Sequence, residues 1–344
     1  MGKPSDAPGQ SPWGFFFLQA ASSADICRAA ALLAHGRLVA LPSETVYGLA
    51  GNAFDPGAVG RIFQVKGRPL LDPLIVHGLH AEALTAVAHF GRAAQRLAKA
   101  LWPGPLTLVL PRRSGVPGLV TAGLPTVAVR CPAHTAFRRV LGRCGFPLAA
   151  PSANPFGYLS PTRAEHVRDS LGDRLPYILD GGPCTHGVES TIVSLRDPQR
   201  PEILRPGPIS PGHICEVLGQ AVPVRPRTRR ESPGETALEA PGTSARHYSP
   251  RKPLRLFQSA TPPPGSTPAT AVVLLKRPQK LANQHTYWLS ESGDLREAAA
   301  NVFDLLRRLD AEPSIRSLQV EQPAPDETGF GLALADRLLR AAAR

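Results

Sequence analysis

The sequence is poor in cysteine and in aromatic residues, and it has no apolar run long enough to cross a membrane. Its five cysteines, at positions 27, 131, 144, 184 and 215, are far apart and form no C-x-x-C pair. This spacing excludes the usual zinc and disulfide frameworks and is typical of a reducing compartment, so we expect a cytoplasmic protein. No stretch approaches the roughly 20 apolar residues of a membrane helix, and the apolar segment at 13–18 is too short for a signal-peptide core.

Familiar catalytic motifs are missing as well. The chain contains no G-x-x-x-x-G-K-[ST] loop, no G-x-G-x-x-G turn and no H-E-x-x-H motif. Ser152 lacks the G-x-S-x-G setting of a nucleophile, and no cysteine–histidine pair stands out. A bound nucleotide would therefore be held by separate cations and polar turns, and catalysis would rest on positioning and charge neutralisation without a covalent intermediate.

What the chain does have is a strong excess of positive charge. Its 39 lysines and arginines against 27 acidic residues give a net charge of +12, with the largest share of the excess in residues 1–216. Such a balance suits a polyanionic ligand, either a nucleotide or a nucleic acid, although an arginine-rich composition can also reflect a genomic bias. Weak binding to tRNA or another RNA is therefore one expectation.

The pattern of apolar segments predicts two α/β units. We expect a disordered tail at 1–14, a large unit at 15–218, a linker rich in proline, arginine and glycine at 219–250, and a small α/β domain at 251–344. Strands and helices alternate in the large unit, with helices expected at 24–35, 82–89 and 92–101.

The densest chemistry lies in residues 41–78. An apolar strand is followed by Thr45 and a glycine-rich loop, and a helix then delivers Lys66 and Arg68 into a turn. A second buried strand ends in His77. Because open α/β sheets bind ligands at strand ends, the set predicts an anion site there, whereas any one of these residues alone would fit a solvated turn.

Polar turns and strand-ending arginines occur further along. Ser152 and Asn154 lie at the end of an apolar segment, and Ser160 follows in a turn of similar composition. Their side chains can bind phosphate or ribose oxygens, or can satisfy the turn's own backbone. Arg130 and Arg205 each end a predicted strand and could bind a carboxylate or phosphate, or form a surface salt bridge.

Taken in order, these segments resemble the YrdC-like domain of threonylcarbamoyl-AMP synthases. The resemblance covers about residues 15–215 and continues through the linker into the small C-terminal domain of the two-domain members. It rests on Ser43-Glu-Thr-Val-Tyr-Gly-Leu49, Lys66-Gly-Arg-Pro69, Pro73-Leu-Ile-Val-His77, Pro151-Ser-Ala-Asn154, Ser160-Pro-Thr162 and Glu189-Ser-Thr-Ile-Val193.

The resemblance implies an α/β fold, with an open, twisted, mixed sheet around a large, basic central cavity. The implied enzyme joins L-threonine, bicarbonate or CO₂ and ATP into L-threonylcarbamoyl-adenylate and releases pyrophosphate. Partner proteins would transfer the product to tRNA next to the anticodon. The resemblance also implies Mg²⁺ carried by ATP, with no metal bound by the protein itself.

Residue roles follow from the same resemblance. Lys66 and Arg68 would act on the phosphates as catalytic groups. L-Threonine would be bound by Thr45, His77, Arg130, Ala150 and Ser190. The nucleotide would contact Lys66, Arg68, Asp72, Thr126, Ser152, Asn154, Ser160, Arg205 and Tyr248.

The chain departs from the family pattern in two places. Asp72 stands where the family commonly has asparagine, after Leu70-Leu71 where polar residues are usual. A carboxylate there would repel phosphate. In the linker, Thr243-Ser244-Ala245 replaces the commoner residues, but His247 and Tyr248 remain, so we expect residues 246–248 to act as part of a lid rather than a plain tether.

Two other functions fit parts of this sequence. An RNA-binding maturation factor would use the basic concavity without catalysis, but no aromatic residues are interleaved with the basic ones to stack bases. A carbamoyl-transferring maturation enzyme for hydrogenases contains a related domain. It would need zinc-binding C-x-x-C pairs and an acylphosphatase-like domain, which this sequence lacks.

Overall fold

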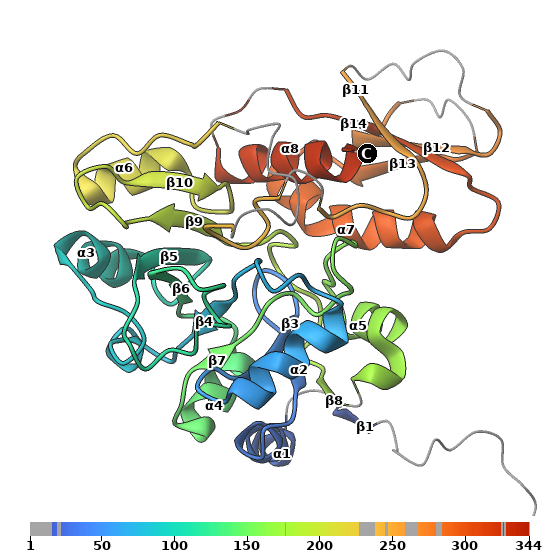
Figure 1. Cartoon of the computed structure of the whole chain (residues 1–344). Helices are drawn as coiled ribbons and strands as arrows, with labels where there is room; N and C mark the ends of the chain where they lie inside the picture. The colour runs from blue at the N-terminus through green and yellow to red at the C-terminus, as the bar shows by residue number, and fades with distance from the viewer. Residues whose placement is uncertain are drawn as a thin grey trace, which may run out of the picture.

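A computed structural model of the chain shows two α/β units that pack against each other (Figure 1). It describes residues 16–18, 22–175, 177–226, 238–244, 247–258, 267–279, 284–324, 326 and 328–343. The expected tail at 1–14 and linker residue Arg246 lie outside the described residues. Within the described part, no helix is long and apolar enough to cross a membrane.

The first unit is built on a mixed sheet of ten strands among the described residues, in the order β1-β8-β2-β3-β7-β4-β6-β5-β9-β10. The sheet contains parallel pairs such as β4–β6 and β5–β9 and antiparallel pairs such as β2–β3 and β9–β10. The strands are β1 (Phe16–Leu18), β2 (Val39–Leu41), β3 (Gly48–Asn52), β4 (Ile75–His77), β5 (Leu106–Pro111), β6 (Thr126–Arg130), β7 (Leu148–Ala149), β8 (Tyr177–Leu179), β9 (Thr191–Ser194) and β10 (Glu202–Arg205). The open mixed sheet expected from the sequence is confirmed.

Helices with clear sequence signals connect these strands. Ser22 and Asp25 form a capping box at the start of α1, and Gly67 ends α2 in the left-handed conformation. The helical segments of this unit are α1 (Ser23–Ala34), α2 (Pro56–Lys66), η1 (Glu82–Leu84), α3 (Arg92–Leu101), α4 (Thr135–Cys144), α5 (Ala164–Leu171), η2 (Gly172–Arg174) and α6 (Pro211–Leu218).

The second unit has a small parallel sheet covered by two helices. Its strand order is β11-β14-β12-β13, from β11 (Leu254–Phe257), β12 (Thr270–Lys276), β13 (Thr286–Ser290) and β14 (Ser317–Glu321). The helices are α7 (Leu295–Ala311) and α8 (Gly329–Ala342). Figure 1 shows them on the side of the small unit that faces the large one, with α8 near β10. The predicted small α/β domain is therefore present.

Three local predictions differ from the structure. The glycine-rich loop expected after Tyr47 is strand β3, because glycines and alanines fit where β7 pairs closely alongside. The helix expected at 82–89 is reduced to the single turn η1. Helix α5 was not predicted, since its eight residues are short for a periodic signal.

Candidate active site

The predicted residues meet where β2, β4 and β6 end. In the parallel β4–β6 register His77 lies opposite Arg130, so both side chains reach the same end of the sheet. Thr45 follows β2 in a turn held by the Ser43 hydroxyl, which accepts from the Val46 amide at 3.1 Å. The sheet thus brings residues 45, 77 and 130 together, as the strand-end argument predicted.

Arg130 is the centre of this group. It is buried and donates from Nη1 to Thr45 Oγ1 at 3.0 Å and from Nη2 to Glu44 Oε1 at 2.6 Å. Burial by itself would raise the pKa of Glu44, but the charge and hydrogen bond of Arg130 hold it below its usual value. Glu44 Oε2 has no hydrogen-bond partner among the described residues. A charged, planar donor is therefore oriented next to an unused carboxylate oxygen.

His77 lies on the wall of the same site with a neutral imidazole. Burial, followed by the neighbouring charge of Arg130, lowers the pKa of its imidazole to about 3. The ring stacks on Phe137 with centroids 5.2 Å apart, and Nδ1 has no hydrogen-bond partner in the described part of the chain. His77 can therefore offer a fixed neutral ring and one polar atom at neutral pH.

Ser190 and Arg205 form a second polar pair at the start of β9 and the end of β10. Arg205 donates from Nε and Nη2 to the Ser190 carbonyl at 3.2 and 3.1 Å, and from Nη2 to its hydroxyl at 3.1 Å. Its Nη1 reaches the Pro241 carbonyl of the linker at 3.0 Å. The Arg205 guanidinium therefore connects the residue before β9 to the linker.

Lys66 is buried behind the turn at residues 152–154 and does not line the cavity. Its ammonium donates to the carbonyls of Ser152 and Asn154 at 2.5 and 2.6 Å, and burial with the nearby Arg68 charge lowers its pKa well below the usual value. In this conformation Lys66 fixes the turn at residues 152–154 instead of lining the cavity.

Arg68 is held by its own turn. It donates from Nε to the Asp72 carbonyl at 3.0 Å and from Nη2 to the Pro73 carbonyl at 2.7 Å. Its Nη2 also lies 2.8 Å from Asp72 Oδ1 as a buried ion pair, yet neither Asp72 carboxylate oxygen has a partner of hydrogen-bond geometry among the described residues. Asp72 therefore neutralises Arg68 from within the chain.

The predicted site residues divide between the wall of the cavity and the layer behind it. Nine lie on the wall: Thr45, Arg68, His77, Arg130, Ala150, Ser152, Ser190, Arg205 and Tyr248. Lys66, Asp72, Thr126, Asn154 and Ser160 are buried but do not line it. Thr126 begins β6 and Arg130 ends it, so the two lie about 13 Å apart at strand spacing.

The cavity is small because the linker fills it. His247 and Tyr248 line it and are buried, next to Pro241 and Gly242 of the same linker. The enclosed volume of about 50 Å³ has room for water, whereas pockets for small molecules take about 300–1,000 Å³. The large cavity that the resemblance implies is therefore not open in this conformation.

Sequence reasoning missed two acidic residues of the site. Glu44 pairs with Arg130, and buried Glu189 accepts from the Ser160 hydroxyl at 2.5 Å. Each is an acidic residue beside a serine or threonine next to a buried strand, which is the signal that could have found it. Among the described residues, no group of three His, Cys, Asp or Glu side chains could hold a metal ion.

The fold and the site define a class: a two-domain α/β protein whose buried polar cavity suits a ligand with carboxylate and phosphate groups. Comparisons with known proteins narrow this class. The family model described as "Telomere recombination", for Sua5, YciO and YrdC proteins, matches residues 31–207. The model of the threonylcarbamoyl-AMP synthase C-terminal domain matches residues 209–343.

Relatives match along nearly the whole chain. Threonylcarbamoyl-AMP synthase of Pyrococcus abyssi is 38% identical over 91% of this chain and 92% of its own length. The Bacillus subtilis enzyme is also 38% identical, over 92% of each chain. The crystal structure of Pyrococcus abyssi Sua5 with L-threonine has a TM-score of 0.81 at 35% identity, covering 92% of this chain and 94% of that one. The chain belongs to the threonylcarbamoyl-AMP synthase family, in its two-domain form.

Proposed function

We propose that this chain makes L-threonylcarbamoyl-adenylate from L-threonine, bicarbonate or CO₂ and ATP, and releases pyrophosphate. The observation that carries the proposal is the match to synthases over both domains, at 38% identity and 91% of the chain. The wall of the cavity fits this chemistry, since it combines a carboxylate-binding arginine with hydroxyls and further arginines for phosphates.

The reaction needs positioning more than covalent help from the protein. The threonine amine adds to CO₂ and loses a proton, which forms the carbamate. A carbamate oxygen then attacks the α-phosphorus of ATP, and the bond to the β-phosphate oxygen breaks to release pyrophosphate. Negative charge grows on the leaving group, so fixed cations near the phosphates would lower the barrier.

The threonine end of the site would be built on Arg130. Its guanidinium can bind the carboxylate of the amino acid, and Thr45 and Ser190 offer hydroxyls on the same wall. Neutral His77 and Ala150 would shape the pocket without adding charge. We infer that the L-threonine bound by the Pyrococcus abyssi relative marks the same end of the cavity.

The nucleotide end would use Arg68 and Arg205 on the wall of the cavity, together with Ser152, which follows β7 on the same wall. Lys66 would have to exchange the carbonyls of Ser152 and Asn154 for phosphate oxygens, which would couple nucleotide binding to movement of that turn. Its catalytic role remains a prediction, as do the nucleotide contacts of Asp72, Thr126, Asn154 and Ser160.

Magnesium would arrive on the triphosphate. Each described carboxylate next to the cavity pairs with an arginine, Glu44 with Arg130, Asp72 with Arg68 and Glu189 with Arg337, so these groups suit counter-ions better than metal ligands. The donor set of the site thus fits a Mg²⁺ ion held by phosphate oxygens, where it would offset their charge.

The linker would have to move to admit both substrates. A cavity of about 50 Å³ cannot hold threonine and ATP until Tyr248 and His247 leave it. This need supports the lid predicted around residues 246–248. We also propose that the reaction takes place in the cytoplasm, and that transfer proteins take the product to tRNA because a carbamoyl-phosphate anhydride hydrolyses readily.

The test is release of pyrophosphate by the purified chain. With ATP, Mg²⁺, L-threonine and bicarbonate present we expect pyrophosphate to accumulate, and omission of any one substrate should remove it. Formation of ADP and phosphate instead, or pyrophosphate release that ignores threonine, would contradict the proposal.

A further inference from the structure

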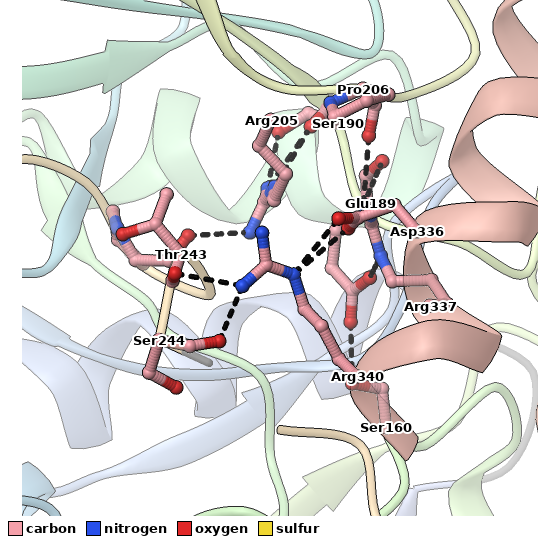
Figure 2. A network of polar contacts seen from close by, with 11 residues as sticks. Ser160, Glu189, Ser190, Arg205, Pro206, Thr243, Ser244, Asp336, Arg337 and Arg340 are labelled. Carbon is pink, nitrogen blue, oxygen red and sulfur yellow. Dashed lines mark hydrogen bonds and ion pairs between the residues drawn. The ribbon is translucent and has the colours of Figure 1, made fainter. Parts of the chain in front are cut away.

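An arginine of the C-terminal domain reaches the candidate site (Figure 2). Arg337 in α8 is almost fully buried and donates from Nε to Glu189 Oε2 at 2.7 Å. Its Nη2 donates to the carbonyls of Glu189 at 3.3 Å and of Pro206 at 3.0 Å. One side chain of the C-terminal domain therefore holds the residue before Ser190 and the residue after Arg205.

Glu189 links Arg337 to Ser160 through hydrogen bonds at its two carboxylate oxygens. Its Oε1 accepts from the Ser160 hydroxyl at 2.5 Å while Oε2 accepts from Arg337. Burial would raise the pKa of Glu189, but Arg337 and Arg205 hold it below its usual value, so both oxygens stay acceptors. The orientation of the Ser160 hydroxyl thus depends on a carboxylate that Arg337 fixes.

Arg337 is itself held on its other sides. Its Nη1 donates to Asp336 Oδ2 at 2.7 Å, and its guanidinium lies 5.2 Å from the centre of the Tyr248 ring. Asp336 also accepts from Arg340, which donates to the Thr243 carbonyl of the linker at 2.7 Å. Figure 2 shows Asp336, Arg337 and Arg340 extending from their helix toward Glu189, Ser190 and Thr243. The guanidinium therefore has a fixed position.

A second helix of the same domain holds Ser160 from its main chain. Arg307 in α7 donates from Nε to the Ser160 carbonyl at 3.2 Å, and its Nη2 contacts the Leu159 carbonyl. Ser160 is thus held at its hydroxyl through α8 and at its backbone through α7. Contacts from the C-terminal domain therefore fix both the side chain and the main chain of Ser160.

We propose that Arg337 is a positioning residue of the active site, which places Ser160 through Glu189 and Arg205 through the adjacent Pro206 carbonyl for the nucleotide. This inference rests on the proposed function, in which Ser160 and Arg205 face ATP. It gives the C-terminal domain a definite role, because the last helix of that domain completes the nucleotide end of a site that lies in the other domain.

The test compares Arg337→Lys with the wild type in the full-length chain. Lysine keeps the positive charge, but its single ammonium cannot orient the Glu189 carboxylate while it also holds Pro206 and Asp336. We expect the Kd of a non-hydrolysable ATP analogue, measured by calorimetry, and the KM for ATP to rise at least tenfold. The KM for threonine should change less, because Thr45 and Arg130 are not part of this network.

Two controls separate positioning from general stability. Arg277→Lys changes an exposed arginine of the same domain that also pairs with a carboxylate and lies over an aromatic ring, Glu291 and Trp288. Val320→Ala weakens the core of the small sheet. We expect Arg277→Lys to change neither stability nor ATP binding, and Val320→Ala to lower the Tm with the Kd for the analogue unchanged.

A double mutant tests the route through Glu189. If Arg337 acts through this carboxylate, Glu189→Gln combined with Arg337→Lys should bind the analogue within about twofold of Glu189→Gln alone. Additive losses, or an Arg337→Lys variant that lowers Tm but leaves the Kd unchanged, would overturn the proposal. Wild-type chain that binds the analogue without releasing pyrophosphate would refute the proposed reaction and leave this test intact, whereas failure to bind any nucleotide would refute both.

Discussion

At the scale of single residues, two arginines of the cavity wall are neutralised by carboxylates of the same chain. Arg130 pairs with Glu44 and Arg68 pairs with Asp72, both buried. Burial raises the pKa of Asp72, although the charges of Arg68 and Lys66 oppose this shift. We therefore expect ligand anions to compete with these carboxylates for the two arginines.

Asp72→Asn tests this competition directly. Asparagine has the same size but no charge, so Arg68 would lose the anion that competes with phosphate while keeping its bonds to the carbonyls of residues 72 and 73. We expect the KM for ATP to fall about tenfold, equivalent to about 1.4 kcal/mol, and the free energy of unfolding to drop by about 3 kcal/mol. Steady-state kinetics and urea denaturation measure the two effects.

The matched control is Asp169→Asn, which removes an exposed carboxylate 3.1 Å from Arg168. An exposed pair contributes at most about 1 kcal/mol, so neither ATP binding nor stability should change noticeably. A higher KM for ATP in Asp72→Asn would show instead that the carboxylate helps to hold the nucleotide.

At the scale of elements, the linker residues Pro241, Gly242, His247 and Tyr248 form part of the cavity wall. Tyr248 adopts a left-handed backbone, φ 60°, and its buried hydroxyl has no hydrogen-bond partner among the described residues. Both features cost free energy, of the order of 1–3 kcal/mol each. Contacts with Arg337 and Phe303 offset this cost. Because these contacts only offset the cost of the Tyr248 conformation, a ligand that supplies new contacts can displace this segment.

Gly242→Ala should shift that balance. Gly242 has φ +73°, and an added Cβ would collide with the Tyr248 hydroxyl and lie 2.9 Å from Arg205 Nη1. We expect the linker to leave the cavity more often, so that limited proteolysis between residues 225 and 250 becomes faster without substrates. ATP and threonine together should then change the wild-type cleavage pattern toward that of the variant.

Gly145→Ala supplies the control, because Gly145 has φ +70° with no atom within 4 Å of an added Cβ. Both variants share the backbone strain of about 1–2 kcal/mol, but only Gly242→Ala adds the collision. Equal cleavage rates in the two variants, with no effect of substrates on the wild type, would contradict a lid made by the linker.

The elements also show why prediction succeeded where it did. Strand ends at Thr45, His77 and Arg130 could be predicted because each follows an apolar run, and a mixed sheet brings such ends together. The engagement of Lys66 with backbone carbonyls could not, since it depends on a turn 86 residues away in sequence. Nor could the Arg337–Glu189 pair, which joins residues 148 positions apart across two domains.

At the scale of the whole molecule, buried arginines of the second unit hold residues of the first unit next to the cavity. The N-terminal sheet carries Arg130, the C-terminal helices contact Ser160 and Glu189 through buried arginines, and the linker lines the cavity. Under the proposal for Arg337, the C-terminal domain affects nucleotide binding although none of its described residues lines the cavity.

The identity of the product decides most directly whether both domains together form a synthase. The measurement incubates the purified chain with ATP, Mg²⁺, L-threonine and ¹³C-labelled bicarbonate, and identifies the adenylate by mass spectrometry. We predict an adenylate that contains threonine and one labelled carbon, formed together with pyrophosphate. Threonyl-adenylate without the labelled carbon, or ATP breakdown with no adenylate at all, would contradict this function.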